Sequence, residues 1–295
     1  MFHYKAWLEK NSDGTFDAVI YINSVEDFSV EFAKELSKGK SWNRLKDKKL
    51  RFIKIILAGT LILSIPFSQV VAKGPRYAMS YIYFGSQSSQ LEYISLAQDT
   101  LAVVSPSYFD LNADGSLKLN SISESYVNAV HGKGIRVVPF LSNHWNRESG
   151  VNALNRIDEL SDEIASAVAR YNLDGINVDI ENVTHTERDK YTELVRQLRN
   201  KLPSDKEVSV AVAANPSGWN TGWHGSYDYK RLGEIADHLF IMSYDEHYQG
   251  SSAGPVASLS FVEKSIQYAL KQQVPSSKIV LGIPFFGRLW AADGS

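Results

Sequence analysis

Apolar and polar residues alternate strictly along residues 173–181, which read LDGINVDIE. An alternation with a period of two is typical of a β-strand, so Asn177, Asp179 and Glu181 share one face of the predicted strand. The intervening apolar residues form the opposite face, which we expect to pack beneath helices. An edge strand with a solvated polar face would show the same alternation. The flanking sequence therefore has to decide between the two.

Helical spacing on both sides of this strand, and again towards the C-terminus, predicts helices over residues 160–171, 186–202 and 261–271. The segments predicted as strands lie, in chain order, at residues 77–84, 101–109, 134–141, 173–181, 208–214, 239–245 and 279–285. Strands that alternate with helices indicate an α/β fold with a parallel sheet. The series favours a (β/α)8 TIM barrel over a doubly wound sheet. Since a barrel needs an eighth strand, we expect the domain of residues 76–295 to be truncated after the seventh.

Two carboxylates and an amide inside a barrel indicate a functional site. Their burial is costly unless a ligand, water or a reaction uses them, and such barrels carry their active sites at the carboxyl ends of the strands. Glu181 lies at that end, and Asp179 is its neighbour on the same face. Carboxylates this close repel each other, which raises the pKa of one of them. We therefore predict that Glu181 stays protonated near neutral pH, as a general acid must.

The residues of this strand resemble a motif of glycoside hydrolase family 18, the chitinases and their relatives. The family motif is Asp-x-x-Asp-x-Asp-x-Glu on the fourth barrel strand, and Asp174, Asn177, Asp179 and Glu181 stand at its positions. Asn177 replaces the second Asp of the motif. This replacement departs from the chitinase pattern and resembles the spore-associated peptidoglycan N-acetylglucosaminidase branch of the family. The resemblance covers residues 76–295 and implies a glycosidase.

The resemblance also implies a mechanism. Family 18 works by substrate assistance, in which the 2-acetamido carbonyl of the substrate attacks the anomeric carbon and the configuration is retained. Glu181 would be the general acid, Asp179 would orient the acetamide, and Asn177 would hydrogen-bond Asp179. Tyr244 would donate its hydroxyl hydrogen to the acetamide carbonyl. This mechanism requires an N-acetylated sugar at the cleaved bond.

Two further segments carry the resemblance. The sequence FIMSYD around Tyr244 resembles the family's Met-x-Tyr-Asp, which implies that Met242 and Asp245 bind the substrate. Packing of Met242 and Tyr244 in the barrel interior is the alternative. The later sequence GIPFFGRLW resembles Gly-x-Pro-x-Tyr-Gly, with Phe286 in place of the tyrosine.

Loop residues after the predicted strands are candidate sugar contacts. Asn215 follows the fifth strand, where a substrate-binding loop is expected, and Trp219 and Trp223 stand nearby as platforms for sugar rings. Asn143, His144 and Trp145 after the third strand are candidates for the same reason. Packing within the loops is the alternative for all of them.

Composition excludes several kinds of chemistry. The 295 residues include no cysteine, so disulfides, thiolate metal sites and thiol catalysis are excluded. A formal net charge of -2 gives no indication of nucleic-acid binding. His247 has no second ligand at a helical spacing, so we expect no metal, and nothing in the sequence indicates a cofactor.

The one compartment signal lies in residues 44–75, where a basic flank precedes an apolar run at 55–67. This order is typical of a secretory signal, and the run is short for a membrane span. Three interpretations stay open: a signal-anchor with a small cytosolic head, a signal peptide behind an upstream start, and a buried core helix. Residues 1–43 form a small N-terminal segment of unknown role, with a predicted strand at 16–22 and a predicted helix at 25–36.

These observations lead to one expectation. We predict an extracytoplasmic enzyme, secreted or tethered to the membrane through residues 55–67, that is associated with the cell wall or spore. It would cleave β-1,4 bonds next to N-acetylglucosamine in peptidoglycan or chitin-type glycans, and we expect a monomer. A sugar-binding lectin on the same fold and an inactive truncated product are the alternatives. Retention of Glu181 argues against the lectin.

Overall fold

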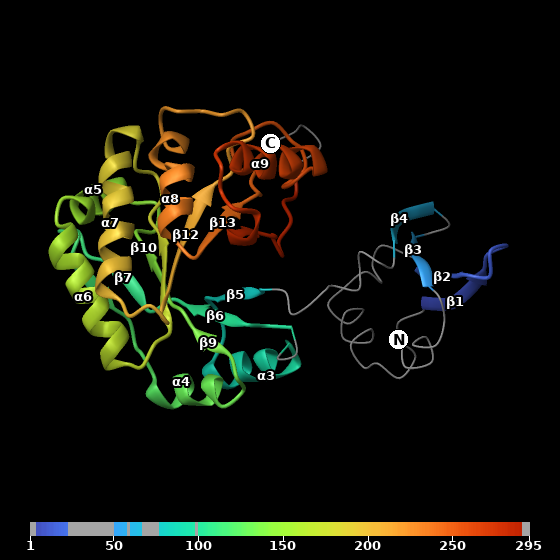
Figure 1. The fold of residues 1–295 in the computed structure, drawn as a ribbon, viewed down its shortest axis with the longest axis horizontal. Helices are drawn as coiled ribbons and strands as arrows, with labels where there is room; N and C mark the ends of the chain where they lie inside the picture. Colours follow the sequence, from blue (N-terminus) through green and yellow to red (C-terminus); the bar gives the residue numbers. More distant parts are fainter. Residues whose placement is uncertain (1–3, 23–49, 58–59, 67–76, 98–99, 291–295) are drawn as a thin grey trace. The chain divides into compact units, whose positions relative to one another are not determined.

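The computed structural model describes residues 4–22, 50–57, 60–66, 77–97 and 100–290. The chain divides into two compact units, Met1–Arg76 and Tyr77–Ser295 (Figure 1). Each unit has β-sheet structure of its own.

The first unit contains a 4-stranded sheet in the order β1-β2-β3-β4. Its strands are β1 Tyr4–Lys10, β2 Phe16–Ile22, β3 Leu50–Leu57 and β4 Thr60–Pro66. β1 and β2 form an antiparallel hairpin, β3 runs parallel to β2, and β4 is antiparallel to β3. The predicted strand at 16–22 is confirmed, whereas the predicted helix at 25–36 lies outside the described residues.

The apolar run at 55–67 is divided between the strands β3 and β4 where the structure describes it. A signal-anchor and a buried core helix both require helical backbone, so the structure does not support either form for this run. The run is rich in isoleucine and leucine, and the branched β-carbon of isoleucine favours extended backbone over helix. Among the described residues, no helix has the length and apolar character needed to cross a membrane.

Parallel strands in chain order build the second unit. Its 3-stranded sheet contains β5 Met79–Ile82, β6 Val103–Pro106 and β9 Arg136–Val137. Its 7-stranded sheet contains β7 Phe109–Leu111, β8 Leu117–Leu119, β10 Phe140–Ser142, β11 Gly175–Asp179, β12 Glu207–Ala213, β13 His238–Met242 and β14 Ile279–Leu281. Only β8, which forms a hairpin with β7, is antiparallel to its neighbour. Each predicted strand segment overlaps one or two of these strands, with ends that differ by one or more residues, and β8 was not predicted.

The two sheets of the second unit continue one another across short breaks in the strands. The Val138 N–H donates to the Val104 carbonyl at 2.9 Å, and the Asn177 N–H donates to the Pro139 carbonyl at 2.8 Å. Pro139 has no N–H to donate, which explains why the ladder is interrupted between β9 and β10. The resulting order, β5, β6–β7, β9–β10 and then β11 to β14, is the order of a β/α barrel.

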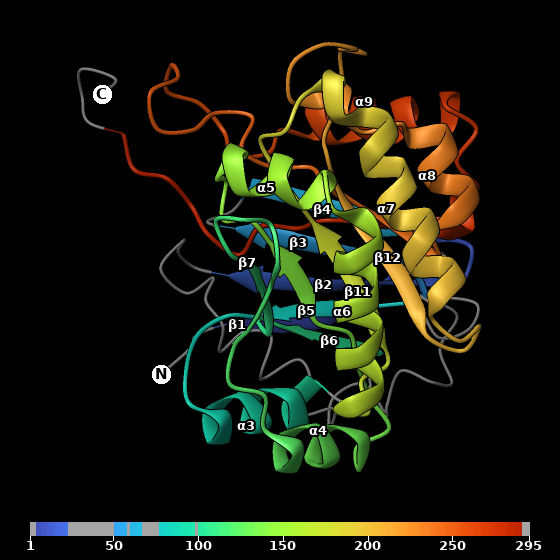
Figure 2. The ribbon, with the colours of Figure 1, turned by 90° about the vertical axis from the view of Figure 1, so that its left-hand side faces the viewer.

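Helices connect these strands and cover the outer face of the sheet (Figures 1 and 2). They are α3 Gln87–Ala97, α4 Glu124–His131, α5 Arg147–Leu154, α6 Ile157–Arg170, α7 Arg188–Lys201, α8 Tyr229–Ile235 and α9 Leu259–Lys271. Short 3-10 turns lie at η3 His185–Glu187, η4 His224–Ser226 and η5 Ser276–Lys278. The three predicted helices are confirmed as α6, α7 and α9.

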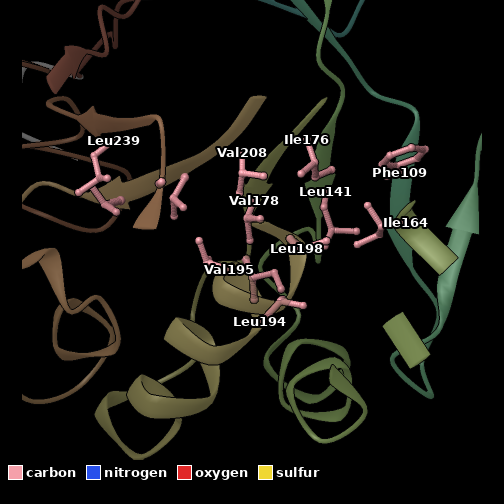
Figure 3. Packing of buried hydrophobic residues seen from close by; sticks show 14 of the residues in the cluster. Phe109, Leu141, Ile164, Ile176, Val178, Leu194, Val195, Leu198, Val208 and Leu239 are labelled. Carbon is pink, nitrogen blue, oxygen red and sulfur yellow. The ribbon is translucent and has the colours of Figure 1, made fainter. Parts of the chain in front are cut away.

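Side chains of β11 divide between the core and the barrel interior as the alternation predicts. Ile176 and Val178 are fully buried, and Figure 3 shows them on the side of the sheet that faces Leu194 and Leu198 of α7. Residues three or four apart share one helix face, so α7 presents an apolar stripe to the sheet. Asn177 lies on the other face of the strand, towards the barrel interior.

Gly175→Ala is expected to destabilise the second unit strongly. Gly175 opens β11 with a φ of +146°, and a Cβ there would lie 2.1 Å from the carbonyl oxygen of Glu207 on β12. Backbone strain and displacement of the neighbouring strand each cost about 1–3 kcal/mol, so denaturant unfolding should show a loss of about 2–6 kcal/mol. Gly134→Ala is the matched control, because φ there is +72° but no atom lies within 4 Å of the added Cβ. We expect a loss of only about 1–2 kcal/mol for the control; equal losses would contradict the packing argument.

Candidate active site

The carboxyl ends of the parallel strands surround a pocket of about 900 Å³. Side chains predicted from the sequence to form a site line this pocket together: Asp179, Glu181, Trp223, Met242, Tyr244 and Asp245. They come from the ends of β11 and β13 and from the loop after β12, which are distant in the sequence. The structure therefore brings most of the predicted site residues into one cavity.

Glu181 and Asp179 face this pocket as a pair of carboxylates. Burial raises the pKa of Glu181 well above that of an ordinary carboxylate, and the charges of Asp179 and Asp245 raise it further. Burial also raises the pKa of Asp179, which the nearby His144 lowers in part. The hydrogen bonds that Glu181 forms with other described residues involve its main-chain N–H and carbonyl, and none involves its carboxyl group. Glu181 can thus hold a proton near neutral pH while its carboxyl group stays free for a substrate.

Asn177 is fully buried beneath the pocket, and its side chain does not bond Asp179. Its Oδ1 accepts a hydrogen bond from the Tyr81 hydroxyl at 2.8 Å, and its Nδ2 donates to Oγ of Ser209 at 3.0 Å. The predicted hydrogen bond between Asn177 and Asp179 is therefore wrong. Residues two apart on one strand are separated by about 6.6 Å, whereas neighbouring strands lie only about 4.8 Å apart. Ser209 is the register partner of Asn177 on β12, so it is the nearer group.

Tyr81 is a site residue that sequence reasoning missed. It lies on β5, lines the pocket beside Phe140 with ring centroids 5.5 Å apart, and donates to Asn177. A signal for it exists in the sequence, because Tyr77, Tyr81 and Tyr83 share one face of a strand with a period of two. That pattern could have placed aromatic side chains on the inner face of the first barrel strand.

Tyr244 and Asp245 follow the end of β13. Burial raises the pKa of Tyr244, and the nearby carboxylates of Asp179 and Glu181 raise it further, so its hydroxyl keeps its proton and can donate it in a hydrogen bond. The Asp245 carboxylate accepts from Nη2 of Arg288 at 2.6 Å. Arg288 belongs to the GIPFFGRLW segment, where its role was not predicted because the contact spans 43 residues of sequence.

Aromatic side chains from two loops form one wall of the pocket. The ring of Trp223 lies 4.8 Å from that of Trp145 and 5.0 Å from that of His224, which in turn lies 4.5 Å from Trp219. Trp145 and Trp219 remain 50% and 47% exposed. Exposed aromatic faces beside the carboxylates are suited to stacking on sugar rings.

Asn215, predicted to bind the substrate, is buried and does not line the pocket. Its Nδ2 donates to the Trp219 carbonyl and its Oδ1 accepts from the Trp219 N–H, both at 2.8 Å. Asn215 therefore fixes the loop that carries Trp219 and does not present its own amide to the cavity.

His247 is hydrogen-bonded through Nδ1 to the Ser252 carbonyl at 2.7 Å. Within the described ranges, no group of three or more His, Cys, Asp or Glu side chains is arranged to hold a metal ion.

Comparison with known proteins matches residues 79–295 to the family described as Glycosyl hydrolases family 18. YdhD of Bacillus subtilis (strain 168), provisionally named a sporulation-specific glycosylase, is 37% identical over 146 residues, 49% of this chain and 33% of that protein. The cortical fragment-lytic enzyme of Bacillus cereus is 27% identical over 236 residues, 75% of this chain and 54% of that protein. The chain thus spans between a third and about half the length of these two relatives.

Solved structures share the fold of the second unit. The spore cortex-lytic enzyme SleL of Bacillus cereus matches with a TM-score of 0.64 and 22% identity, over 76% of this chain and 54% of that chain. A chitinase from Chromobacterium violaceum ATCC 12472 matches with a TM-score of 0.62 and 24% identity, over 70% and 68% of the two chains. At these identities the likeness shows the fold alone, and it confirms the α/β fold expected from the strand order.

Proposed function

The chain belongs to glycosyl hydrolase family 18, and from this premise we propose that it is a glycosidase that cleaves β-1,4 bonds next to N-acetylglucosamine. We place peptidoglycan first as its substrate and chitin-type oligomers second. The names of YdhD, of the cortical fragment-lytic enzyme and of the spore cortex-lytic enzyme support a role in the spore or cell wall. Such a substrate lies outside the cytoplasm, so the proposal includes export of the second unit.

In the proposed reaction, Glu181 gives its proton to the glycosidic oxygen as the bond to the leaving sugar breaks. The acetamide oxygen of the N-acetylated sugar bonds to the anomeric carbon in the same step. Water later attacks the anomeric carbon, gives a proton back to the Glu181 carboxylate and opens the oxazolinium ring with net retention. Asp179 orients the acetamide and balances its positive charge. Tyr244 donates a hydrogen bond to the acetamide oxygen, because its raised pKa keeps the hydroxyl protonated.

The observation that carries this proposal is the environment of Glu181. Its carboxyl group is partly enclosed, has a raised pKa and faces the same pocket as Asp179 and Tyr244. A general acid needs these properties, since it must be protonated at the working pH and free to reach the leaving oxygen. A lectin on the same fold has no use for a protonated acid at this position.

We expect kcat/KM of the unmodified chain, which depends on the protonation state of the free enzyme, to fall as the pH rises above neutrality. The raised pKa of Glu181 means that the proton is present at neutral pH and is lost only at a higher pH than for an ordinary carboxyl group. Since the protonated form is the active acid, activity is present below this pKa and declines as the pH passes through it. Initial rates on an N-acetylglucosamine oligomer across a pH series measure this limb. A rate that stays constant through the alkaline range would contradict the assignment.

The proposed function is tested with the 295-residue chain on purified peptidoglycan and on an N-acetylglucosamine oligomer. We expect new reducing ends at N-acetylglucosamine, with the β configuration in the first product seen by NMR. Cleavage with inversion would overturn the mechanism. Binding to either glycan without any cleavage by the folded chain would favour the lectin.

A further inference from the structure

Glu181 lies two residues beyond the end of β11, where pairing with the neighbouring strand has stopped. β11 ends at Asp179, and the pairing of β10 with β11 ends where Ser142 meets Asp179. No side chain among the described residues bonds the carboxyl group of Glu181. The direction of this carboxyl group must therefore be set through the main chain of residue 181.

One buried side chain holds both polar main-chain groups of Glu181. Oδ1 of Asn143 accepts from the Glu181 N–H at 2.8 Å, and Nδ2 of Asn143 donates to the Glu181 carbonyl at 2.7 Å. The same Nδ2 donates to the Asn146 carbonyl at 2.8 Å, so both of its hydrogens are used. Asn143 is only 3% exposed and does not line the pocket. It can therefore influence a bound substrate only indirectly, through the main-chain groups that it holds.

Further contacts fasten the same two segments to each other. Nδ2 of Asn182 donates to the Trp145 carbonyl at 2.9 Å, and Nε of Arg147 donates to the Asn182 carbonyl at 2.9 Å. Helix α5 can pack closely against Asn143 and Val183 because it has a glycine, Gly150, at the contact. A Cβ at Gly150 would lie 2.9 Å from Nδ2 of Asn143. The loop after β10 and the start of α5 thus form a rigid support for residues 181 and 182.

We propose that Asn143 is the positioning residue of the general acid: by holding the N–H and the carbonyl of Glu181, it aims the carboxyl group at the leaving oxygen. This inference rests on the proposed function. A displacement of about 1 Å in a reacting group can cost about 100-fold in rate, so loss of this support should affect catalysis more than binding.

The proton transfer itself provides a readout that separates positioning from general damage to the fold. A sugar leaving group needs the proton of Glu181 as its bond to the anomeric carbon breaks. A dinitrophenolate leaving group departs as a stable anion and needs little help from an acid. A misplaced Glu181 should therefore slow the first substrate far more than the second, whereas a loosened barrel should slow both alike.

The test compares Asn143→Ala with the unmodified 295-residue chain on an N-acetylglucosamine oligomer and on dinitrophenyl chitobioside. We expect kcat/KM on the oligomer to fall by about 10- to 100-fold with KM changed less than about 2-fold. On the dinitrophenyl substrate, kcat/KM reports cleavage of the bond to the leaving group alone and should fall less than about 3-fold. Glu181→Gln should give the same pattern with a larger loss on the oligomer.

Two more variants complete the design. Asn152→Ala is the matched control. Asn152 lies on α5, and its Nδ2 donates to the Ala113 carbonyl at 2.8 Å and does not contact Glu181. It should leave both rates unchanged. Gly150→Ala keeps the Asn143 side chain and favours the helix. Its Cβ would lie 2.9 Å from both Nδ2 of Asn143 and Cγ1 of Val183, on either side of residues 181 and 182, so it should displace Glu181 and show the leaving-group pattern even if Asn143→Ala does not fold.

Equal losses on both substrates would reduce Asn143 to a structural residue and overturn the inference. Unchanged rates on both substrates in Asn143→Ala would also overturn it. If the unmodified, folded chain cleaved neither substrate, the proposed function itself would be refuted, which is a different and recognisable outcome.

Discussion

Glu181→Gln is expected to lower kcat on an N-acetylglucosamine oligomer by about 10²- to 10⁴-fold, the usual contribution of a general acid. The amide has nearly the same shape and volume as the carboxyl group, but it has no acidic proton to give to the glycosidic oxygen. The pocket and its aromatic wall stay intact, so the Kd for the oligomer should change by less than about 3-fold. Hydrolysis rates and a titration of tryptophan fluorescence measure the two effects separately.

The matched control for this substitution is Glu148→Gln. Glu148 is an exposed glutamate in the first turn of the neighbouring helix α5, outside the pocket. The same chemical change there should leave kcat within about 2-fold, as is usual for surface positions. If Glu181→Gln kept the full rate on the oligomer, another group would have to supply the proton and our assignment of the acid would be wrong.

The alternation at 173–181 allowed β11 to be predicted because a period of two depends only on local backbone geometry. Glu181 and Asp179 could be placed on the inner face for the same reason. The short helices α4, α5 and α8 were not predicted, since each has only 7 or 8 residues and shows too few apolar repeats for a pattern to stand out.

Contacts between strands depend on register, which a local pattern does not contain. Tyr81 and Asn177 are 96 residues apart and meet only because β5 and β11 belong to one barrel. Asn143 reaches Glu181 across 38 residues for the same reason. The bond from Asn177 to Asp179, which the family resemblance implied, is absent because the Asn177 amide is bonded to Tyr81 and to Ser209, its register partner on the next strand.

The apolar run at 55–67 shows how a compartment pattern can conflict with secondary structure. A basic flank before an apolar stretch is typical of export signals, whatever backbone the stretch adopts. The side-chain types give different information: isoleucine is frequent in this run, and its branching favours β3 and β4 over a helix. The export-signal pattern depends only on hydrophobicity and charge, so it does not include the preference of isoleucine for extended backbone.

Asp179→Asn is expected to lower kcat by about 10²- to 10³-fold and to move the alkaline limb of the pH profile to lower pH. The rate falls because the positive charge that develops on the acetamide loses its facing carboxylate, and one preorganised electrostatic contact is commonly worth this much. The limb moves because the charge of Asp179 is one cause of the raised pKa of Glu181. Without that charge, Glu181 releases its proton at a lower pH, although burial still holds its pKa above the ordinary value.

Asp245→Asn gives a second, smaller movement of the alkaline limb with which that of Asp179→Asn can be compared. Asp245 also raises the pKa of Glu181, but less than Asp179 does, and its carboxylate is paired with Arg288. The alkaline limb should therefore move furthest in Asp179→Asn, less in Asp245→Asn, and not at all in Glu148→Gln. Rates on the dinitrophenyl substrate should still fall in Asp179→Asn, because the acetamide attacks whatever the leaving group is. A limb that stays in place in Asp179→Asn would mean that the charge of Asp179 does not raise the pKa of the acid and that these two carboxylates act independently.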